Sequence, residues 1–269
     1  MELNFYKYEG AGNDFILIDG RGQDLELPGS TISRLCDRHL GIGADGLMIL
    51  ADEAGYDFRM RYYNADGGEV DMCGNGGRCI VLFADHLGIG ANEKYFIGRD
   101  GKHYAQIISK GDDAALVELE MINVDSFQYS DKTFCLNTGV PHYVEFVDDV
   151  SSVDVDGRGR AIRYSKRFEA GGGTNVDFVE IAGPGYIKVR TYERGVEGET
   201  QACGTGVTAA AIATYLYAQN DIYNFTVNVP GGELEVDFAV KDGSHFYDIR
   251  LTGPARRVFG GTIRVDKVK

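Results

Sequence analysis

Short runs of hydrophobic residues, separated by polar turns, recur along the chain and predict β-strands. Each run is rich in β-branched and aromatic residues and is bounded by glycine, aspartate or asparagine, as strands usually are. A single helix-like stretch, residues 31–40, stands between the early runs. The predicted strands are residues 15–19, 46–50, 58–63, 114–119, 142–147, 177–181, 186–191, 225–229 and 245–251.

Two further segments, residues 76–87 and 205–218, carry hydrophobic or small residues around most of a helical cylinder. This pattern is typical of a helix that is buried on most sides. In a chain otherwise rich in strands, such a helix indicates a sheet curved around it. The sequence therefore predicts an α/β protein with two domains, each a curved mixed sheet wrapped around a central buried helix.

An internal repeat supports this division. The frame G-E-x-x-x-C-G-x-G occurs at residues 68–76 and again at 198–206, offset by 130 positions without a gap. A chance match between two glycine-rich turns is the alternative, but a duplicated half-domain explains the shared Cys and Glu as well. We predict a first domain of residues 1–117 plus 254–269, which carries Cys73, and a second of residues 118–253, which carries Cys203.

Composition narrows the class of partner and the compartment. Among 269 residues, 43% are hydrophobic and 25% charged, which is ordinary for a folded domain. The 41 acidic side chains outnumber the 27 basic ones, giving a net charge of −14 that disfavours nucleic acid and anionic membranes. No apolar run is long enough to span a membrane, and five cysteines fit thiols in a reducing compartment. We expect a cytoplasmic protein.

Each repeat places a cysteine directly before a predicted buried helix. Unpaired N–H groups and aligned peptide dipoles favour negative charge at a helix N-terminus. We therefore expect the pKa of Cys73 and of Cys203 to be depressed. The bare backbone of residues 74–76 and 204–206 is also suited to binding a carboxylate.

This pair of thiols suits inversion of a carbon stereocentre. One group must remove a proton from one face while the other delivers a proton to the opposite face. Helix N-termini aimed at the substrate carboxylate would stabilise the charge that develops there. Such a reaction requires no cofactor and no metal. If both halves face one cleft, we further expect Cys73 and Cys203 to oxidise to a disulfide in air, which non-reducing peptide mapping would detect.

Other patterns carry less chemistry. Residues 41–46 match G-x-G-x-x-G but follow a helix-like stretch and precede a strand, the reverse of a dinucleotide site. The spacing of Cys79 from Cys73 fits no common zinc site. Cys79, Cys36 and Cys135 are each expected to be buried core residues.

A single histidine and an acidic run have structural interpretations when taken alone. His142 follows a proline at the start of a predicted strand, where a histidine more often has a structural role. The acidic run at residues 148–154 is expected to be a solvated loop.

The motifs together resemble the diaminopimelate epimerase family over essentially the whole chain. The two Cys-Gly-x-Gly blocks are the most specific of them. The matching segments are residues 10–15 (GAGNDF), 64–67 (NADG), 72–78 (MCGNGGR), 173–178 (GTNVDF), 193–195 (ERG) and 202–206 (ACGTG).

The resemblance implies cofactor-independent interconversion of LL- and meso-2,6-diaminopimelate, a step toward lysine and cell-wall precursors. It also implies two pseudo-symmetric domains with the active site in the cleft between them. Cys73 and Cys203 would be the acid/base residues, exchanging roles with reaction direction, assisted by His142 and Glu193. The implied substrate contacts are the side chains of Asn13, Asn64, Asn175, Glu193 and Arg194 and the backbone of Gly74, Asn75, Gly204 and Thr205.

The chain departs from the family pattern at three positions. Many members have Gln in place of Gly46 and Asn in place of Val140, both among the substrate contacts. These departures motivate a rival substrate, another amino acid such as histidine or proline. Phe259 stands where many members have a Tyr at a dimer interface. Loss of the hydroxyl need not prevent packing at such an interface, so a homodimer is still expected.

Two other classes of function remain open at this stage. A transferase or hydrolase would use Cys203 as nucleophile and His142 as base, and would form a covalent intermediate. A non-catalytic module would use the glycine turns only as an anion site, which leaves the matched cysteines unexplained.

Overall fold

The computed structural model describes residues 1–23, 25–219 and 221–265 and divides into two compact units. The last four residues of the predicted first domain lie outside the described residues. Unit 1 comprises Met1–Leu119 and Gly253–Lys269, and unit 2 comprises Glu120–Thr252. One long strand, β17 (His245–Arg264), runs from unit 2 into unit 1. Cys73 belongs to unit 1 and Cys203 to unit 2.

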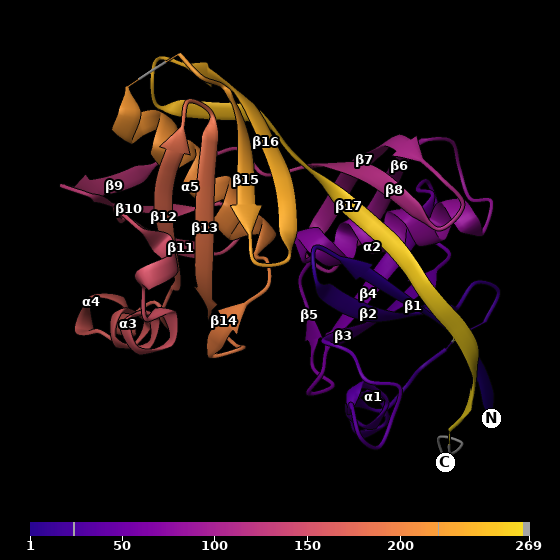
Figure 1. Cartoon of the computed structure of the whole chain (residues 1–269). Helices are drawn as coiled ribbons and strands as arrows, with labels where there is room; N and C mark the ends of the chain where they lie inside the picture. Colours follow the sequence, from indigo (N-terminus) through magenta and orange to yellow (C-terminus); the bar gives the residue numbers. More distant parts are fainter. Residues whose placement is uncertain (24, 220, 266–269) are drawn as a thin grey trace. The chain divides into compact units, whose positions relative to one another are not determined.

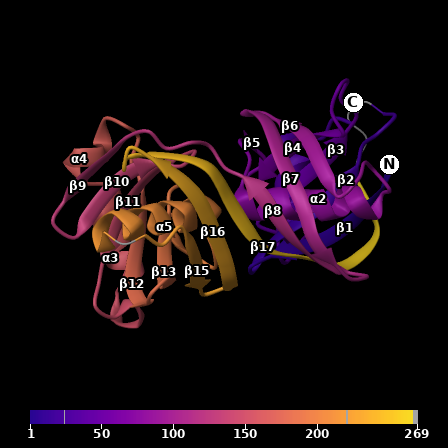
Figure 2. The ribbon, with the colours of Figure 1, turned by 90° about the horizontal axis from the view of Figure 1, so that it is seen from above.

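Unit 1 is a strongly curved sheet around a central helix. Neighbouring strands pair in the order β1-β2-β3-β4-β6-β7-β8, and the end of β17 pairs with both β8 and β1, so the sheet closes on itself. In Figure 2, helix α2 runs inside this ring. The elements are β1 (Glu2–Gly10), β2 (Asn13–Asp19), α1 (Gly29–Cys36), β3 (Gly46–Ala51), β4 (Phe58–Asn64), β5 (Glu69–Val70), α2 (Gly74–His86), β6 (Glu93–Gly98), β7 (Gly101–Lys110) and β8 (Ala114–Glu120).

Unit 2 repeats the same pattern. Its strands pair in the order β10-β11-β12-β13-β15-β16-β17, with the same alternation of parallel and antiparallel neighbours as in unit 1. Helix α5 lies against this sheet (Figure 1). The elements are β9 (Phe127–Ser130), β10 (Thr133–Asn137), β11 (Pro141–Phe146), η1 (Val150–Ser152), α3 (Val155–Arg163), α4 (Lys166–Glu169), β12 (Asn175–Gly183), β13 (Tyr186–Glu193), β14 (Gly198–Thr200), α5 (Gly204–Ala218), β15 (Asn224–Val229) and β16 (Gly232–Lys241).

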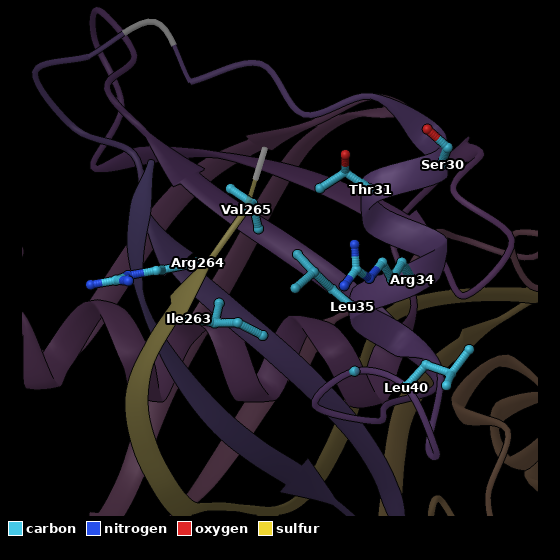
Figure 3. A pocket seen from close by; sticks show the side chains of 9 residues that line it. Ser30, Thr31, Arg34, Leu35, Leu40, Ile263, Arg264 and Val265 are labelled. Atoms are coloured by element: carbon cyan, nitrogen blue, oxygen red, sulfur yellow. The ribbon is translucent and has the colours of Figure 1, made fainter. Parts of the chain in front are cut away.

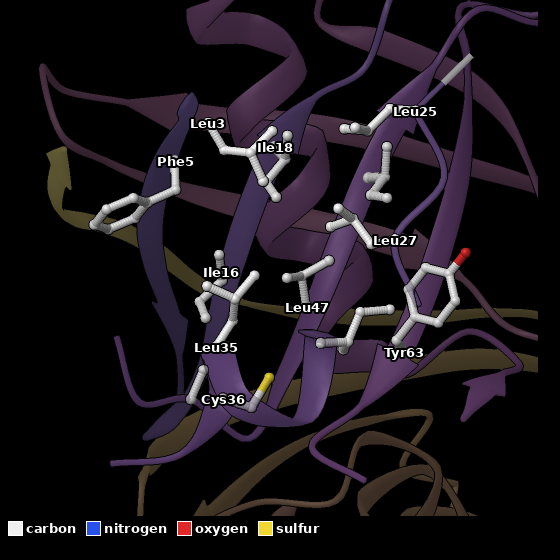
Figure 4. Packing of buried hydrophobic residues seen from close by; sticks show 13 residues of the cluster. Leu3, Phe5, Ile16, Ile18, Leu25, Leu27, Leu35, Cys36, Leu47 and Tyr63 are labelled. Atoms are coloured by element: carbon white, nitrogen blue, oxygen red, sulfur yellow. The ribbon is translucent and has the colours of Figure 1, made fainter. Parts of the chain in front are cut away.

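The strand β3 shows why the sequence folds around a buried helix. Five of its six residues are buried, because both faces of the strand are covered, and a strand covered on both faces is hydrophobic throughout. Leu47 and Ile49 pack into a cluster with Ile32 and Leu35 of α1, which lies on the outer face of the sheet (Figure 4). Met48 points to the opposite face, toward Gly76 of α2.

The predicted fold class is confirmed: two pseudo-symmetric units each wrap a curved mixed sheet around a buried helix. All nine predicted strands are present. The strand predicted at 245–251 continues to Arg264, because it pairs in turn with β16, β8 and β1. The predicted helix 31–40 ends at Cys36, since the Asp37 side chain accepts hydrogen bonds from the N–H groups of His39 and Leu40 and turns the chain.

Two other expectations were only partly right. The run 148–154 is a solvated loop only in part: its aspartates and serines are exposed, but Val150 and Val153 are buried in a cluster with Phe178, and Asp149 and Asp154 cap the short helices η1 and α3. Cys135 is only partly buried, since it lies on the face of β10 opposite to the buried Phe134, where Arg167 donates to its sulfur at 3.2 Å.

Candidate active site

In unit 1, Cys73 is the N-cap residue of α2. Its backbone is extended, and its carbonyl accepts the first helical hydrogen bond from Gly77 N–H at 2.7 Å. The cysteine is partly exposed, whereas the helix from Gly74 to Ala84 is buried. A Cβ on Gly76 would come within 2.1 Å of the terminal methyl of Met48, so a larger residue here would displace that side chain. The sequence thus lets the sheet pack closely against the first turn of the helix.

Asn13 lies beside this thiol. Its side-chain oxygen is 3.8 Å from Cys73 Sγ and accepts a hydrogen bond from Asn75 Nδ2 at 3.4 Å. Its Nδ2 donates to the Asp45 carboxylate at 2.6 Å, which fixes the orientation of the amide. Asn13 follows a tight turn in which Ala11 and Gly12 have positive φ. Three of the predicted site residues of unit 1 are therefore in contact.

Arg78, in the second turn of α2, is a residue whose importance the sequence analysis missed. It is completely buried, and its Nη2 donates to Asn75 Oδ1 at 2.8 Å. Its other donors reach the carbonyls of Gly74 at 3.3 Å and Pro254 at 3.2 Å. A buried guanidinium thus holds the first turn of the helix. The Arg in the motif G-G-R was the available signal.

In unit 2, Cys203 is the N-cap residue of α5, with the same extended backbone and a hydrogen bond from Val207 N–H to its carbonyl at 2.8 Å. Its sulfur lies 3.5 Å from Thr205 Oγ1. Thr205 Oγ1 in turn lies 2.9 Å from His142 Nε2, and His142 Nδ1 lies 2.7 Å from Asp177 Oδ2. A continuous chain of polar contacts therefore connects the thiol with a buried carboxylate.

Strand register brings these side chains together. His142 of β11 pairs with Asn175 of β12 in a parallel ladder, and Asp177 of β12 pairs with Thr191 of β13 in an antiparallel one. Residues 175 and 177 face the same side of the sheet, because strand side chains alternate. Thr191 Oγ1 donates to Asp177 Oδ1 at 2.8 Å. Asp177 had no predicted role, although it belongs to the quoted motif GTNVDF.

The remaining predicted residues of unit 2 adjoin the same chain. Asn175 Nδ2 lies 3.3 Å from His142 Nε2, and its oxygen accepts a hydrogen bond from Arg194 N–H at 2.7 Å. Arg194 also donates to the Gly173 carbonyl at 3.4 Å. Glu193, at the end of β13, is close enough to Cys203 for its charge to act on the thiol.

The expected depression of the Cys203 pKa is wrong. Complete burial raises the pKa of this thiol well above its usual range, and the carboxylates of Glu193 and Asp177 add to the effect. The hydrogen bond with Thr205 acts in the opposite direction but is outweighed. Desolvation disfavours an anion more than the helix N-terminus favours it here. The surroundings of Cys203 therefore favour the neutral thiol over the thiolate.

Asn64 lies at the edge of the residues around Cys73. The same holds for the two positions that depart from the family pattern, Gly46 near Cys73 and Val140 near Cys203. Asn64 ends β4 opposite Gly46, and among the described residues only its main chain forms hydrogen bonds. A Cβ on Gly46 would lie 2.6 Å from the Tyr62 ring and 2.7 Å from the Tyr63 carbonyl oxygen, so glycine is required for packing. Val140 lies in the turn before β11.

A hollow of about 270 Å³ in unit 1 lies elsewhere, between α1 and the end of β17. Leu35, Ile263 and Val265 give it an apolar wall, and Arg34 stands beside them (Figure 3). None of the predicted site residues lines it. In the described part of the chain, no helix is long and apolar enough to cross a membrane, and no group of three acidic, His or Cys side chains is arranged to hold a metal ion.

Comparison with known proteins identifies the family. The family described as Diaminopimelate epimerase matches residues 5–121 and 134–258. A diaminopimelate epimerase of Flavobacterium psychrophilum is 47% identical over 97% of this chain and 100% of its own length, and one of Aquifex aeolicus is 38% identical over 97% and 98%.

Solved structures match at the level of the fold. A phenazine biosynthesis protein of the PhzF family from Bacillus anthracis has a TM-score of 0.76 at 13% identity, over 98% of this chain and all of its own. A predicted epimerase from Pseudomonas aeruginosa has a TM-score of 0.71 at 13% identity, with the same coverage. The chain belongs to the diaminopimelate epimerase family, and it is an epimerase, a class of isomerase.

Proposed function

We propose that this member of the family interconverts LL- and meso-2,6-diaminopimelate, with Cys73 and Cys203 as the two acid/base residues. One observation carries the proposal: each cysteine of the duplicated frame is the N-cap of the central buried helix of its own unit. The substrate is inferred from the names of two relatives, which are 47% and 38% identical to this chain over nearly its whole length.

In the proposed reaction, the thiolate of one cysteine removes the proton from the α-carbon. The thiol of the other cysteine delivers its proton to the opposite face, so the configuration inverts. After turnover the two sulfurs have exchanged protonation states, and the reverse reaction uses them in exchanged roles. No other group has to gain or lose a proton in the chemical step.

The helix N-termini support the charge that develops during proton removal. As the α-carbon loses its proton, negative charge spreads onto the substrate carboxylate. The N–H groups of Gly74 and Asn75, or of Gly204 and Thr205, are oriented to stabilise a carboxylate by virtue of their position in the first helical turn. Donors fixed before the reaction cost no reorganisation during it.

We assign the remaining predicted residues to substrate binding. Arg194 offers a planar guanidinium for a carboxylate. Asn13, Asn64 and Asn175 offer both donors and acceptors, as recognition of ammonium and carboxylate groups requires. Glu193 offers a carboxylate for an ammonium group and, with His142, assists the thiols.

Deuterium exchange tests the proposal. LL-diaminopimelate in D₂O, without pyridoxal phosphate or metal, is expected to gain deuterium at the α-carbon while the meso isomer forms. Cys73→Ala and Cys203→Ala are each expected to lose epimerisation by about 1000-fold or more, because one of two proton-transfer groups is removed. Cys135→Ala is the matched control and retains activity. Undiminished epimerisation in either alanine variant contradicts the mechanism.

Two further measurements separate the alternatives. A covalent adduct on Cys203 in intact-mass spectra during turnover would indicate a transferase or hydrolase instead. Faster epimerisation of another amino acid in a panel assayed by chiral chromatography would keep the mechanism but change the substrate.

We also propose a cytoplasmic homodimer that serves lysine and peptidoglycan precursor synthesis. The pathway follows from the proposed substrate, and the compartment from cysteines that form no disulfide among the described residues. Phe259 of β17 is about half exposed, as is its neighbour Val258, and its ring packs edge-on against Phe5 with centroids 6.0 Å apart. Phe259→Asp is expected to yield monomers in sedimentation analysis, and an unchanged dimer contradicts this interface.

A further inference from the structure

His142 is completely buried, and both of its ring nitrogens are engaged. Nδ1 lies 2.7 Å from Asp177 Oδ2, and both side chains have no exposed surface. Nε2 lies 2.9 Å from Thr205 Oγ1 and 3.3 Å from Asn175 Nδ2. The imidazole can therefore neither turn toward solvent nor exchange partners without disturbing the core.

The partners of this histidine indicate the directions of its hydrogen bonds. A carboxylate only accepts, and Asp177 already accepts from the Thr191 hydroxyl, so His142 Nδ1 must carry the proton. Asn175 Oδ1 accepts from Arg194 N–H, so the Asn175 amide presents its Nδ2 donor to His142 Nε2, which indicates that Nε2 is an acceptor. The Thr205 hydroxyl donates to it, and the Thr205 oxygen is left to accept from the thiol of Cys203, 3.5 Å away.

We propose that Asp177 is a positioning residue, which fixes the imidazole of His142 so that it takes the proton of Cys203 through the hydroxyl of Thr205. The proposal rests on the proposed function, in which Cys203 must become a thiolate in one direction of the reaction. The thiol proton passes to Thr205 Oγ1 as the hydroxyl proton passes to His142 Nε2. The products are a thiolate and an imidazolium, and Asp177 stabilises the imidazolium.

The chain of contacts supplies a proton acceptor to a thiol whose deprotonation is otherwise disfavoured. Burial and two carboxylates raise the pKa of Cys203. Solvent water has little access to it, since the residue is 6% exposed. A buried acceptor reached through one hydroxyl removes the proton without opening the site, and leaves a positive charge near the thiolate.

The corresponding position of unit 1 carries an amide in place of the hydroxyl. The position that corresponds to Thr205 in the repeat, 130 residues earlier, is Asn75. Its amide donates to Asn13 and accepts from Arg78, at 3.4 and 2.8 Å. An amide does not pass protons on as a hydroxyl does, so we propose the hydroxyl relay for Cys203.

Nitrogen NMR of the ligand-free protein tests the geometry independently of activity. With ¹⁵N-labelled histidine, the His142 signals are those lost in His142→Gln. We expect a neutral ring with its proton on Nδ1, and a far-downfield Nδ1 proton that moves upfield in Asp177→Asn. A neutral ring with its proton on Nε2 would overturn the proposal, because that nitrogen could not accept from Thr205. This result stands whether or not diaminopimelate is the substrate.

Kinetics test the relay itself. Thr205→Val keeps the backbone donor and the side-chain volume but removes the hydroxyl, and is expected to lower kcat about 100-fold with KM changed less than about threefold. Thr205→Ser restores the hydroxyl and most of kcat. The matched control is Thr208→Val, since Thr208 lies on the same helix but donates to the Gly204 carbonyl at 3.0 Å. Asp177→Asn is expected to lower kcat by about 100-fold.

Three outcomes separate the two proposals. If Thr205→Val loses no more activity than Thr208→Val, the relay is wrong while the proposed function stands. If the wild-type enzyme does not epimerise diaminopimelate but shows the expected His142 proton, the proposed function fails and the geometry stands. A loss of kcat in Thr205→Val that Thr205→Ser does not restore also contradicts the relay.

Discussion

Replacing Asp14 with asparagine is expected to destabilise unit 1 in a pH-dependent way. Asp14 lies next to Asn13 and forms an ion pair with the buried Lys7, Nζ to Oδ2 at 2.8 Å, while Arg38 donates to both of its oxygens at 2.8 and 3.0 Å. Burial by itself raises the pKa of Asp14, but the hydrogen bonds from Arg38 and Lys7 outweigh it and hold the pKa at about 2.

The magnitude follows from this pKa. The ordinary value for an aspartate is 3.8, and the difference corresponds to about 2.5 kcal/mol of stability at neutral pH. Because the folded pKa is depressed, this contribution is fully present above the unfolded pKa and is lost as the pH falls from 3.8 toward 2. By pH 3, only about half of it remains.

Urea unfolding at pH 7 and pH 3 measures the effect. The chain has no tryptophan, so circular dichroism follows the whole chain, and labelling of the buried Cys36 with dithiodipyridine, located by peptide mass spectrometry, reports unit 1 separately. Asp14→Asn is expected to be less stable than wild type by at least about 2.5 kcal/mol at pH 7, and the difference should shrink by about 1 kcal/mol at pH 3. Asp148→Asn is the control, because that carboxylate is 97% exposed beside Lys132. A difference that stays constant between the two pH values would refute the reasoning.

Three further substitutions test packing at the two helix N-termini and at the start of β3. Gly206→Ala would place a Cβ 2.3 Å from Asp177 Oδ1, so we expect a loss of about 1–3 kcal/mol and a fall in kcat, measured by urea unfolding and the epimerase assay. Gly46→Ala would place a Cβ 2.6 Å from a tyrosine ring of β4 and should lose a similar amount of stability. Gly183→Ala is the control, because a Cβ there has no neighbour within 4 Å and stability should not fall. Equal stabilities of the two variants would contradict the contact at Gly46. Arg78→Met removes the guanidinium hydrogen bonds to the Asn75 side chain and to the carbonyls of Gly74 and Pro254, and a loss of about 2–3 kcal/mol is expected by the same assay; an unchanged stability would show that the helix turn holds without the guanidinium.

The repeated frame gives the two units the same first turn but different neighbours. The positions that follow Cys73 and Cys203 by five residues are Arg78 and Thr208, and each donates to the carbonyl of the glycine after its cysteine. The first turn of α2 therefore contacts a buried guanidinium, whereas the first turn of α5 contacts a neutral hydroxyl. The two first turns share a backbone geometry, and their electrostatic environments differ.

Much of the fold was predictable because its signals are local. A helix with small or hydrophobic residues on all sides must be buried, and runs of β-branched residues between glycines must be strands. Helix α3 went unpredicted, because its nine residues include three arginines, two glycines and an aspartate and only Val155 and Gly159 are buried. Its position depends on packing against β12 and β13, which no local pattern encodes.

The candidate site was predictable in part. The motifs supplied the cysteines, His142 and the asparagines, because those residue types carry recognisable chemistry. Asp177 was missed, since its partner His142 lies 35 positions earlier and only the register of β11 with β12 makes them neighbours. The pKa of Cys203 was predicted in the wrong direction, because helix position is visible in a sequence and burial by distant strands is not.

The amino-acid sequence alone determined that the chain has two related halves, that each half surrounds a helix, and that a cysteine begins each helix. These properties depend on residues that are close together in the chain. Only the tertiary structure decided that one thiol is partly exposed near a buried arginine while the other is enclosed with two carboxylates and a histidine. Strands separated by tens of residues supply those neighbours, and solvation and charge at a thiol depend on what surrounds it in space.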